Sequence, residues 1–124
     1  MLHRVLIVDD DPDIRDTVIE VLEEQGCEVL GAANGNEALA KLRAAPDHPC
    51  LILLDLMMPV MDGRAFREAQ LEDPAISEIP VVVISAFRDV ADTADAMGVA
   101  AHVKKPVSLK DLIALVHRYC GNVA

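Results

Sequence analysis

Short apolar runs alternate with amphipathic stretches five times along the chain. The run from Arg4 to Asp9 is apolar at nearly every position, which is typical of a strand buried on both faces. Apolar residues at helical spacing follow it, and Asp11 with Pro12 predicts an N-cap and first turn, while Gly26 predicts the helix end. Alternation of this kind predicts a parallel sheet with helices on both faces.

The same reasoning places the other elements. Further strands are expected at Glu28–Ala33, Leu51–Asp55, Pro80–Ser85 and Ala101–Lys104, and further helices at Asn36–Arg43, Arg64–Leu71, Asp89–Met97 and Ser108–Cys120. Apolar spacing in the first helix predicts that Ile14 faces the core, and spacing in the last predicts the same for Leu109. Arg64 and Arg67 are interpreted as part of a solvated helix face.

Polar residues stand at the ends of most of these strands. Asp9 and Asp10 end the first strand, Asp55 ends the third and Ser85 the fourth, and Lys105 follows the last. Ligands of parallel α/β sheets bind outside the carboxyl ends of the strands. We therefore expect these side chains to form one site.

Composition narrows the class of protein. The 124 residues fit one domain, and with 52% apolar but only 2% aromatic residues the core must be aliphatic. The net charge of −10 argues against direct binding of nucleic acid. No apolar run approaches the ~20 residues of a membrane span, and acids at positions 9–11 interrupt any signal peptide. A soluble cytoplasmic protein is expected.

The three cysteines are odd in number and widely spaced. Cys27, Cys50 and Cys120 form no Cys-x-x-Cys pair. We interpret them as reduced, partly buried thiols rather than as a disulfide framework or a zinc site.

The predicted site has a recognisable chemistry. Three neighbouring carboxylates repel one another unless a cation lies between them, and Mg²⁺ prefers carboxylates with waters and a phosphate. A lysine ammonium suits phosphate oxygens, and Ser85 adds a hydroxyl. Such a set stabilises phosphoryl transfer to a carboxylate.

Four segments together resemble the receiver domain of response regulators, the CheY-like phosphoacceptor of two-component signalling. The matching segments are Val5–Pro12 (VLIVDDDP), Leu53–Gly63 (LLDLMMPVMDG), Val83–Ala86 (VISA) and His102–Pro106 (HVKKP). They occur in family order and span the chain from Arg4 to about Tyr119. The resemblance implies a flavodoxin-like (βα)5 fold with strand order 2-1-3-4-5, and a single receiver domain over residues 1–124 with no output domain.

The resemblance also implies roles at the strand ends. Asp55 would accept a phosphoryl group from a histidine kinase. Asp10 would bind Mg²⁺ (or Mn²⁺) directly and Asp9 through water, with Asp55 and the backbone carbonyl of Met57 completing the protein ligands. Lys105 would contact a phosphoryl oxygen.

Two further residues match the switch positions of the family. The hydroxyl of Ser85 would move to the phosphoryl group, and His102 stands where an aromatic residue that turns inward is usual. Imidazole is smaller than the usual ring and titrates near neutrality. His102 is therefore either a weaker, pH-sensitive switch or a half-exposed residue on an edge strand.

Two other departures from the family concern the segment after Ser85 and the neighbours of the acceptor. The 13 positions from Ser85 to Gly98 are about two fewer than usual, so the fourth helix is expected to be short or irregular. Met57 and Phe87 are apolar where relatives place polar residues that position the attacking water. Slow self-dephosphorylation is the resulting hypothesis.

Several readings of the function remain open. The domain would signal through protein contacts to a separate effector, as a monomer or a phosphorylation-dependent dimer, with only self-phosphorylation and slow self-dephosphorylation as reactions. The alternatives are a phosphorelay intermediate that exchanges phosphoryl groups with a phosphotransfer protein, and a receiver-like binding module that works without phosphorylation. A serine hydrolase is disfavoured because Ser85 lies in no Gly-x-Ser-x-Gly motif.

Overall fold

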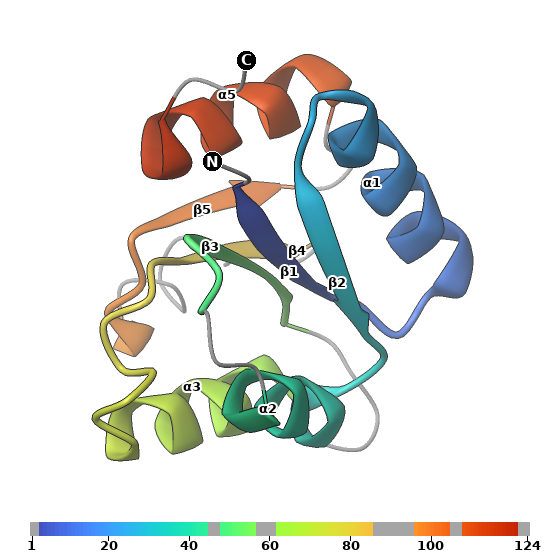
Figure 1. Cartoon of the computed structure of the whole chain (residues 1–124). Coiled ribbons are helices and arrows are strands. Elements are labelled where there is room, and N and C mark those ends of the chain that lie inside the picture. Colours follow the sequence, from blue (N-terminus) through green and yellow to red (C-terminus); the bar gives the residue numbers. More distant parts are fainter. Residues whose placement is uncertain (1–2, 45–47, 57–61, 86–95, 105–107, 122–124) are drawn as a thin grey trace.

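Strands and helices alternate through the part of the chain that the computed structural model describes, residues 3–44, 48–56, 62–85, 96–104 and 108–121. Figure 1 shows their arrangement. The strands are β1 (Arg4–Val8), β2 (Glu28–Ala32), β3 (Leu51–Asp55), β4 (Val81–Ser85) and β5 (Ala101–Lys104). The helices are α1 (Pro12–Glu24), α2 (Gly35–Ala44), α3 (Gly63–Glu72) and α5 (Leu109–Cys120). Among these described helices, none has the length and apolar character needed to cross a membrane.

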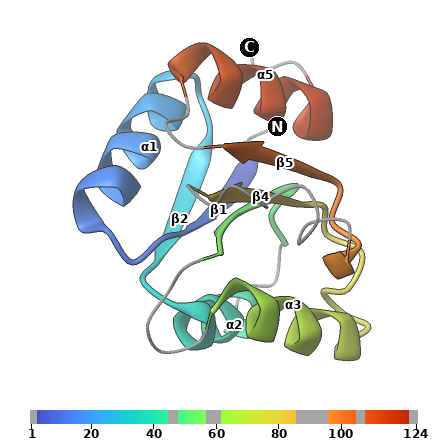
Figure 2. The same ribbon diagram turned by 180° about the vertical axis from the view of Figure 1, so that it is seen from behind.

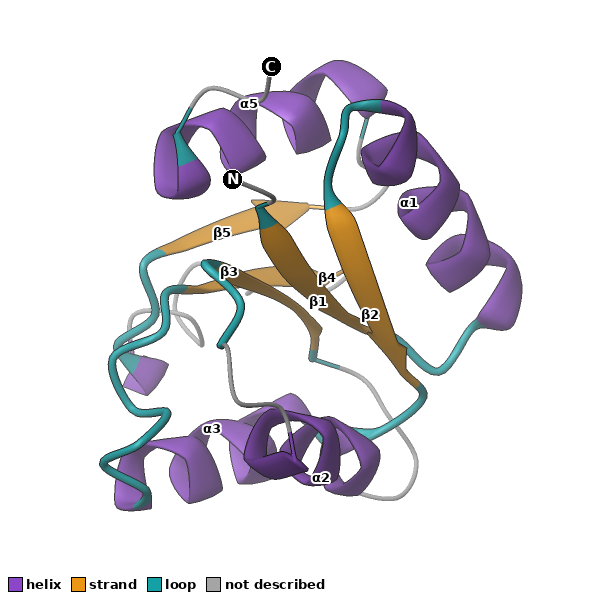
Figure 3. Ribbon diagram, viewed as in Figure 1, coloured by secondary structure: helices purple, strands orange, loops and turns teal. Residues whose placement is uncertain are grey.

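The five strands form one parallel sheet in the order β2-β1-β3-β4-β5 (Figure 3). This confirms the predicted fold class and strand order. In a parallel sheet all strands run the same way, so their carboxyl ends share one edge and their amino ends the other. We call these the carboxyl edge and the amino edge.

Helices cover both faces of the sheet, with α1 and α5 on one side and α2 and α3 on the other (Figures 1 and 2). Alternate strand residues serve the two cores, because successive side chains of a strand point to opposite faces. Leu6, Val8, Ile52, Leu54, Val81 and Val83 pack on the α2–α3 side, and Val5, Ile7, Leu51, Leu53, Val82 and Ile84 pack on the α1–α5 side. Burial on both faces explains why these strands are continuous apolar runs in the sequence.

Helix starts follow the capping signals. The side chain of Asp11 accepts hydrogen bonds from the backbone N–H groups of Asp13 and Ile14, with Pro12 in the first turn. Gly26 has a φ of 89°, the left-handed conformation that ends a helix. At α5, the hydroxyl of Ser108 accepts from the N–H of Asp111.

Two predicted core residues lie at the surface. Leu109 is 53% exposed and Ile14 is 39% exposed, whereas Leu112, Val116 and Leu22 in later turns are buried. Both exposed residues belong to the first turns of their helices. Helical spacing correctly identified the buried stripe but not the point at which the stripe leaves the core.

The helix predicted at Asp89–Met97 falls mostly outside the described residues. Ala96 and Met97 are helical, and Gly98 follows with a φ of 65°. The prediction that this helix is short or irregular therefore stays a prediction.

Cys50 and Cys120 form a disulfide, while Cys27 is a free, buried cysteine. The prediction of three reduced thiols is thus wrong for two of them. The fold returns the end of α5 to the start of β3, which brings together residues 70 positions apart. Pairing over such a distance is not deducible from cysteine spacing.

Candidate functional site

Three carboxylates meet at the carboxyl edge. Asp55 ends β3 and Asp9 follows β1, and these strands are neighbours in register through Val8 and Leu54. Asp10 comes one residue later. One oxygen from each of the three carboxylates lies within 4.8 Å of the others. The predicted convergence of these residues is confirmed, and we call this group the acidic pocket.

The three members differ in burial. Asp9 is 2% exposed and Asp55 is 5% exposed, whereas Asp10 is exposed to solvent. The pocket is therefore lined by two buried carboxylates and open at Asp10. A ligand entering from solvent would meet Asp10 first.

The turn between β1 and α1 fixes the position of Asp9. Its carboxylate oxygen Oδ1 accepts a hydrogen bond from the N–H of Asp11 at 2.9 Å. Its backbone carbonyl accepts from Nη1 of Arg15 at 2.8 Å, and its N–H donates to the carbonyl of Ala32 at 3.0 Å. Asp11 thus caps α1 with its side chain and orients Asp9 with its backbone.

The donor set of the acidic pocket fits a small hard cation. Like charges within 4.8 Å repel, and a divalent cation among them removes the conflict. Magnesium binds oxygen at about 2.0–2.1 Å, so opposite ligands lie roughly 4 Å apart, close to the span of these oxygens. Magnesium usually binds one or two carboxylates directly and keeps water in other positions, so the three carboxylates could hold it directly or through water.

Ser85 lies beside the acidic pocket. It ends β4, the strand next to β3, and Asp55 is in register with the preceding residue Ile84. Its side chain is completely buried. Ser85 thus ends β4 at the carboxyl edge, and its burial means that any movement of the hydroxyl takes place inside the protein.

Two predicted ligands lie outside the described residues, namely Met57 and Lys105. Lys104, which immediately precedes Lys105, ends β5 in register with Ser85 and is exposed. The described part of β5 therefore ends at the carboxyl edge beside Ser85.

His102 is exposed on the edge strand β5. Its neighbours Ala101 and Val103 pack on the α1–α5 side, so the alternation of the strand directs His102 to the other face. The outward position is the one that either reading of His102, switch or simple surface residue, would give.

Gly63 brings the start of α3 against the acceptor strand. A Cβ atom at Gly63 would lie 3.0 Å from the carbonyl oxygen of Asp55 and 3.0 Å from Cα of Leu56. The N–H of Gly63 also donates to the carbonyl of Leu56 at 3.1 Å. Only glycine allows this approach without displacing the backbone that carries Asp55.

Arg67 and Gln70 have structural roles that the sequence analysis missed. Arg67 is only 9% exposed, so its interpretation as a solvated residue is wrong. It donates to the carbonyls of Met97 and Gly98 and to the side chain of Gln70. Burial lowers the pKa of its guanidinium below the ordinary value. A signal was available for Gln70, which lies four residues after the inward residue Phe66, and Arg67 in turn lies three residues before Gln70.

Comparison with known proteins agrees with the geometry. Residues 5–117 match the family described as response regulator receiver domain. An uncharacterised 14.6 kDa protein of Leptolyngbya boryana is 36% identical over 94% of this chain and 88% of its own length. Protein PilG of Pseudomonas aeruginosa is 32% identical over 91% and 84%. The chain spans about half, 46%, of a probable transcriptional regulator of Cyanophora paradoxa that is 37% identical over 91% of the chain.

Solved structures give the same result. The chemotaxis response regulator CheY4 of Vibrio cholerae superposes with a TM-score of 0.86 at 30% identity, covering 96% of this chain and 99% of that one. The phosphorylated cyanobacterial phytochrome response regulator RcpA superposes with a TM-score of 0.79 at 26% identity, covering 100% and 98%.

Proposed function

Because the chain belongs to the response regulator receiver family, we propose that it is a phosphoacceptor switch in which Asp55 receives a phosphoryl group. The observation that carries this proposal is the acidic pocket, with Asp9, Asp10 and Asp55 within 4.8 Å at the carboxyl edge. A cluster of like charges at the end of buried strands stabilises nothing by itself. Such a cluster can bind a cation, and the cation can in turn bind a phosphoryl group.

Asp55 is the nucleophile in this proposal. A carboxylate oxygen attacks the phosphorus of a phosphohistidine, the new O–P bond forms as the P–N bond breaks, and the imidazole leaves with a proton from solvent. Since Asp55 is 5% exposed, the donor approaches only from the carboxyl edge. The product is an acyl phosphate, which brings further negative charge to the site.

A bound cation and a lysine would offset that charge. Asp9, Asp10, Asp55 and the Met57 carbonyl are the proposed protein ligands of Mg²⁺. When bound, Mg²⁺ supplies positive charge that stabilises the phosphoryl oxygens in the transition state. Lys105 is proposed to pair with one of these oxygens.

Ser85 and His102 are proposed as the switch. The buried hydroxyl of Ser85 turns toward the phosphoryl oxygen, which vacates space beneath β5. His102 then turns inward from its exposed position.

The partners follow from this chemistry. A sensor histidine kinase or a phosphotransfer protein would supply the phosphoryl group in the cytoplasm, and a separate effector would read the switched surface. No direct contact with nucleic acid is proposed, in keeping with the net charge of −10.

The acyl phosphate is proposed to be long-lived. Neither Met57 nor Phe87 has a side-chain oxygen or nitrogen that could orient an attacking water. After removal of the donor, the phosphorylated protein should decay slowly, and Met57→Asn should shorten its lifetime. Complete decay of the wild type within seconds would contradict this proposal.

Phosphorylation with a small donor tests the function. Incubation with phosphoramidate and Mg²⁺ should add one phosphoryl group to the wild type, as measured by intact mass, and excess chelator should prevent it. Asp55→Asn should remain unmodified, because an amide is not a nucleophile here. Asp16→Asn removes an exposed acid of α1 and should behave as wild type. No modification of the wild type, or equal modification of Asp55→Asn, would indicate a module that works without phosphorylation at this site.

A further inference from the structure

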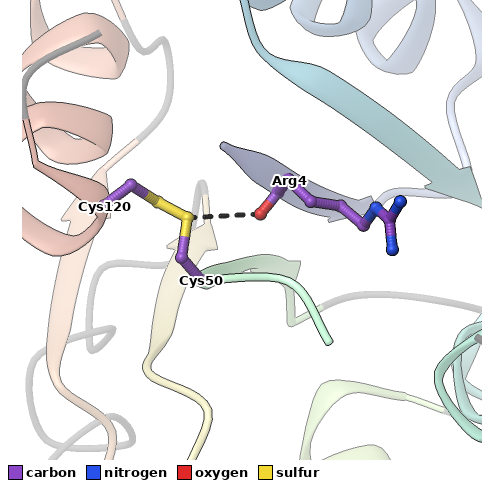
Figure 4. Close-up of a disulfide and its surroundings, with 3 residues drawn as sticks. All are labelled: Arg4, Cys50 and Cys120. Atoms are coloured by element: carbon purple, nitrogen blue, oxygen red, sulfur yellow. Dashed lines mark hydrogen bonds between the residues drawn. A yellow bond between two sulfur atoms is a disulfide. The ribbon is translucent and has the colours of Figure 1, made fainter. Parts of the chain in front are cut away.

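A covalent bond joins the end of α5 to the residue that precedes β3. Cys120 is the last residue of α5 and Cys50 directly precedes β3, with their Cα atoms 5.4 Å apart (Figure 4). Cys50 therefore lies at the amino edge. The five residues of β3 place it about 16 Å from Asp55 at 3.3 Å per residue.

The bond holds the last turn of α5 in particular. Leu112 and Val116 anchor the middle of the helix, being 3% and 1% exposed. Tyr119 and Cys120 are only partly buried against the same core. The final turn therefore has fewer packing contacts than the middle, and the disulfide is its covalent link to the sheet.

The surroundings of Cys50 suit a thiol as well as a disulfide. The carbonyl oxygen of Arg4 lies 3.2 Å from the sulfur of Cys50 and also accepts the N–H of Cys50 at 2.8 Å (Figure 4). A disulfide sulfur has no proton, so this contact becomes a hydrogen bond only when Cys50 is reduced. The cores on both faces of the sheet are filled by other residues, and a domain of this size folds without a cross-link.

We propose that Cys50 and Cys120 form a reversible thiol–disulfide site, which a protein dithiol of the Cys-x-x-Cys class opens in the folded state. Both cysteines are partly exposed, which permits attack on the bond. Disulfides in the reducing cytosol are rare and usually redox-active. A redox-active role of this kind rests on the cytoplasmic location proposed above, whereas the test below uses no property of Asp55.

The reaction balances as a two-electron exchange. A thiolate of the reductant attacks one sulfur of the Cys50–Cys120 bond and forms a mixed disulfide, releasing the other cysteine. The second thiol of the reductant then displaces the remaining cysteine. Two electrons and two protons pass to Cys50 and Cys120, and the reductant leaves as its own disulfide.

Reduction releases the last turn of α5 and leaves the acidic pocket intact, because the two sites lie at opposite ends of β3. The part of the chain affected ends at Gly121, whose N–H donates to the carbonyl of His117 at 3.1 Å. Amides of residues 118–121 should therefore exchange with solvent faster, while those near Leu112 keep their protection.

The test treats the folded, oxidised protein with reduced thioredoxin. The number of free thiols per chain, counted by rapid alkylation and denaturation, should rise from one to three. When the reductant is removed and a mild oxidant is added, the number should return to one. The melting temperature should fall by roughly 10 °C on reduction, given a loop of 70 residues. Hydrogen exchange should change at the end of α5 alone.

Variants distinguish a disulfide that opens reversibly in the folded protein from one that stays closed. Cys50→Ser keeps a donor for the carbonyl of Arg4, and with Cys120→Ala it should give a folded protein that no reductant affects. Cys27→Ala should retain the whole response. Three free thiols in aerobically purified wild type would overturn the proposal, and so would a bond that thioredoxin opens only after unfolding.

Discussion

The two edges of the sheet are stabilised in opposite ways. At the amino edge, the guanidinium of Arg4 pairs with Glu28 at 2.8 Å, Cys50 is bonded to Cys120, and Gln70 donates to backbone carbonyls of the loop that leads into β4. At the carboxyl edge, Asp9 and Asp55 end neighbouring strands as carboxylates of the same charge. The described contacts of one edge are an ion pair, a disulfide and hydrogen bonds, whereas the other edge gathers like charges that a bound cation would offset.

This difference separates stability from function along each strand. Residues at the amino edge should matter for folding and little for phosphorylation. The carboxylates at the carboxyl edge should show the reverse, since neutralising one of them relieves repulsion. The two kinds of residue occur at the two ends of β3: Cys50 directly precedes the strand and Asp55 is its last residue.

The largest effect on stability is expected at Gln70. Its side chain is fully buried, accepts from Arg67 at 2.7 Å and donates to the carbonyls of Ile76 and Ile79. Gln70→Ala leaves these groups without their partner and creates a cavity, which should cost about 3 kcal/mol. Urea denaturation measures the loss. A cost below about 1 kcal/mol, at the level of exposed surface substitutions, would contradict this role of the amino edge.

The next largest effect on stability is expected at Gly63, which lies at the carboxyl edge. Gly63→Ala places Cβ 3.0 Å from the backbone of Asp55 and Leu56, so one of the two segments must shift. We expect a loss of about 1–2 kcal/mol, despite the better helix propensity of alanine, and weaker binding of Mg²⁺. Arg64→Ala, at an exposed neighbouring position of α3, should change neither measurement. Unchanged Mg²⁺ affinity in Gly63→Ala would separate Gly63 from the site.

Substitution of Asp10 should change stability in the opposite direction, by raising it. Asp10→Asn removes one of the three charges of the acidic pocket, which should raise stability by up to about 1 kcal/mol at low salt without divalent cations. The same change should reduce the stabilisation that Mg²⁺ gives to the protein. Thermal melts with and without Mg²⁺ measure both effects, and Asp16→Asn is the control. An apo protein destabilised by Asp10→Asn would contradict the repulsion.

The smallest effect concerns Cys27, at the amino edge before β2. Burial raises the pKa of its thiol above the ordinary value of 9.0. The thiol form is favoured in the folded state, so the associated stability is present below pH 9 and is lost as pH rises through the raised pKa. Wild type should lose stability over this range slightly more than Cys27→Ala. Parallel losses in the two proteins would show that Cys27 does not titrate differently on folding.

Most of the fold was predictable because burial produces patterns of apolar and polar residues within short segments of the sequence. Strands buried on both faces read as apolar runs, and residues such as Asp11 and Ser108 cap helices through contacts only two or three positions away. The acidic pocket was predictable too, since parallel pairing brings strand ends together whichever residues occupy them.

The missed features depend on contacts between distant segments. Cys50 meets Cys120 only because α5 returns along the sheet, and Arg67 is buried because carbonyls of Met97 and Gly98 lie within its reach. Polarity alone placed Arg67 at the surface. A long side chain with several donors can be buried wherever backbone carbonyls accept them.

The most direct test of the account is the response to beryllofluoride, which mimics the acyl phosphate. With Mg²⁺ and beryllofluoride together, the amide NMR signals near Asp55, Ser85 and His102 should shift in wild type, and those of Gln70 should not. Neither reagent alone should reproduce the change, and Asp55→Asn should not respond. An equal response in Asp55→Asn, or none in wild type, would contradict a phosphoacceptor at the carboxyl edge.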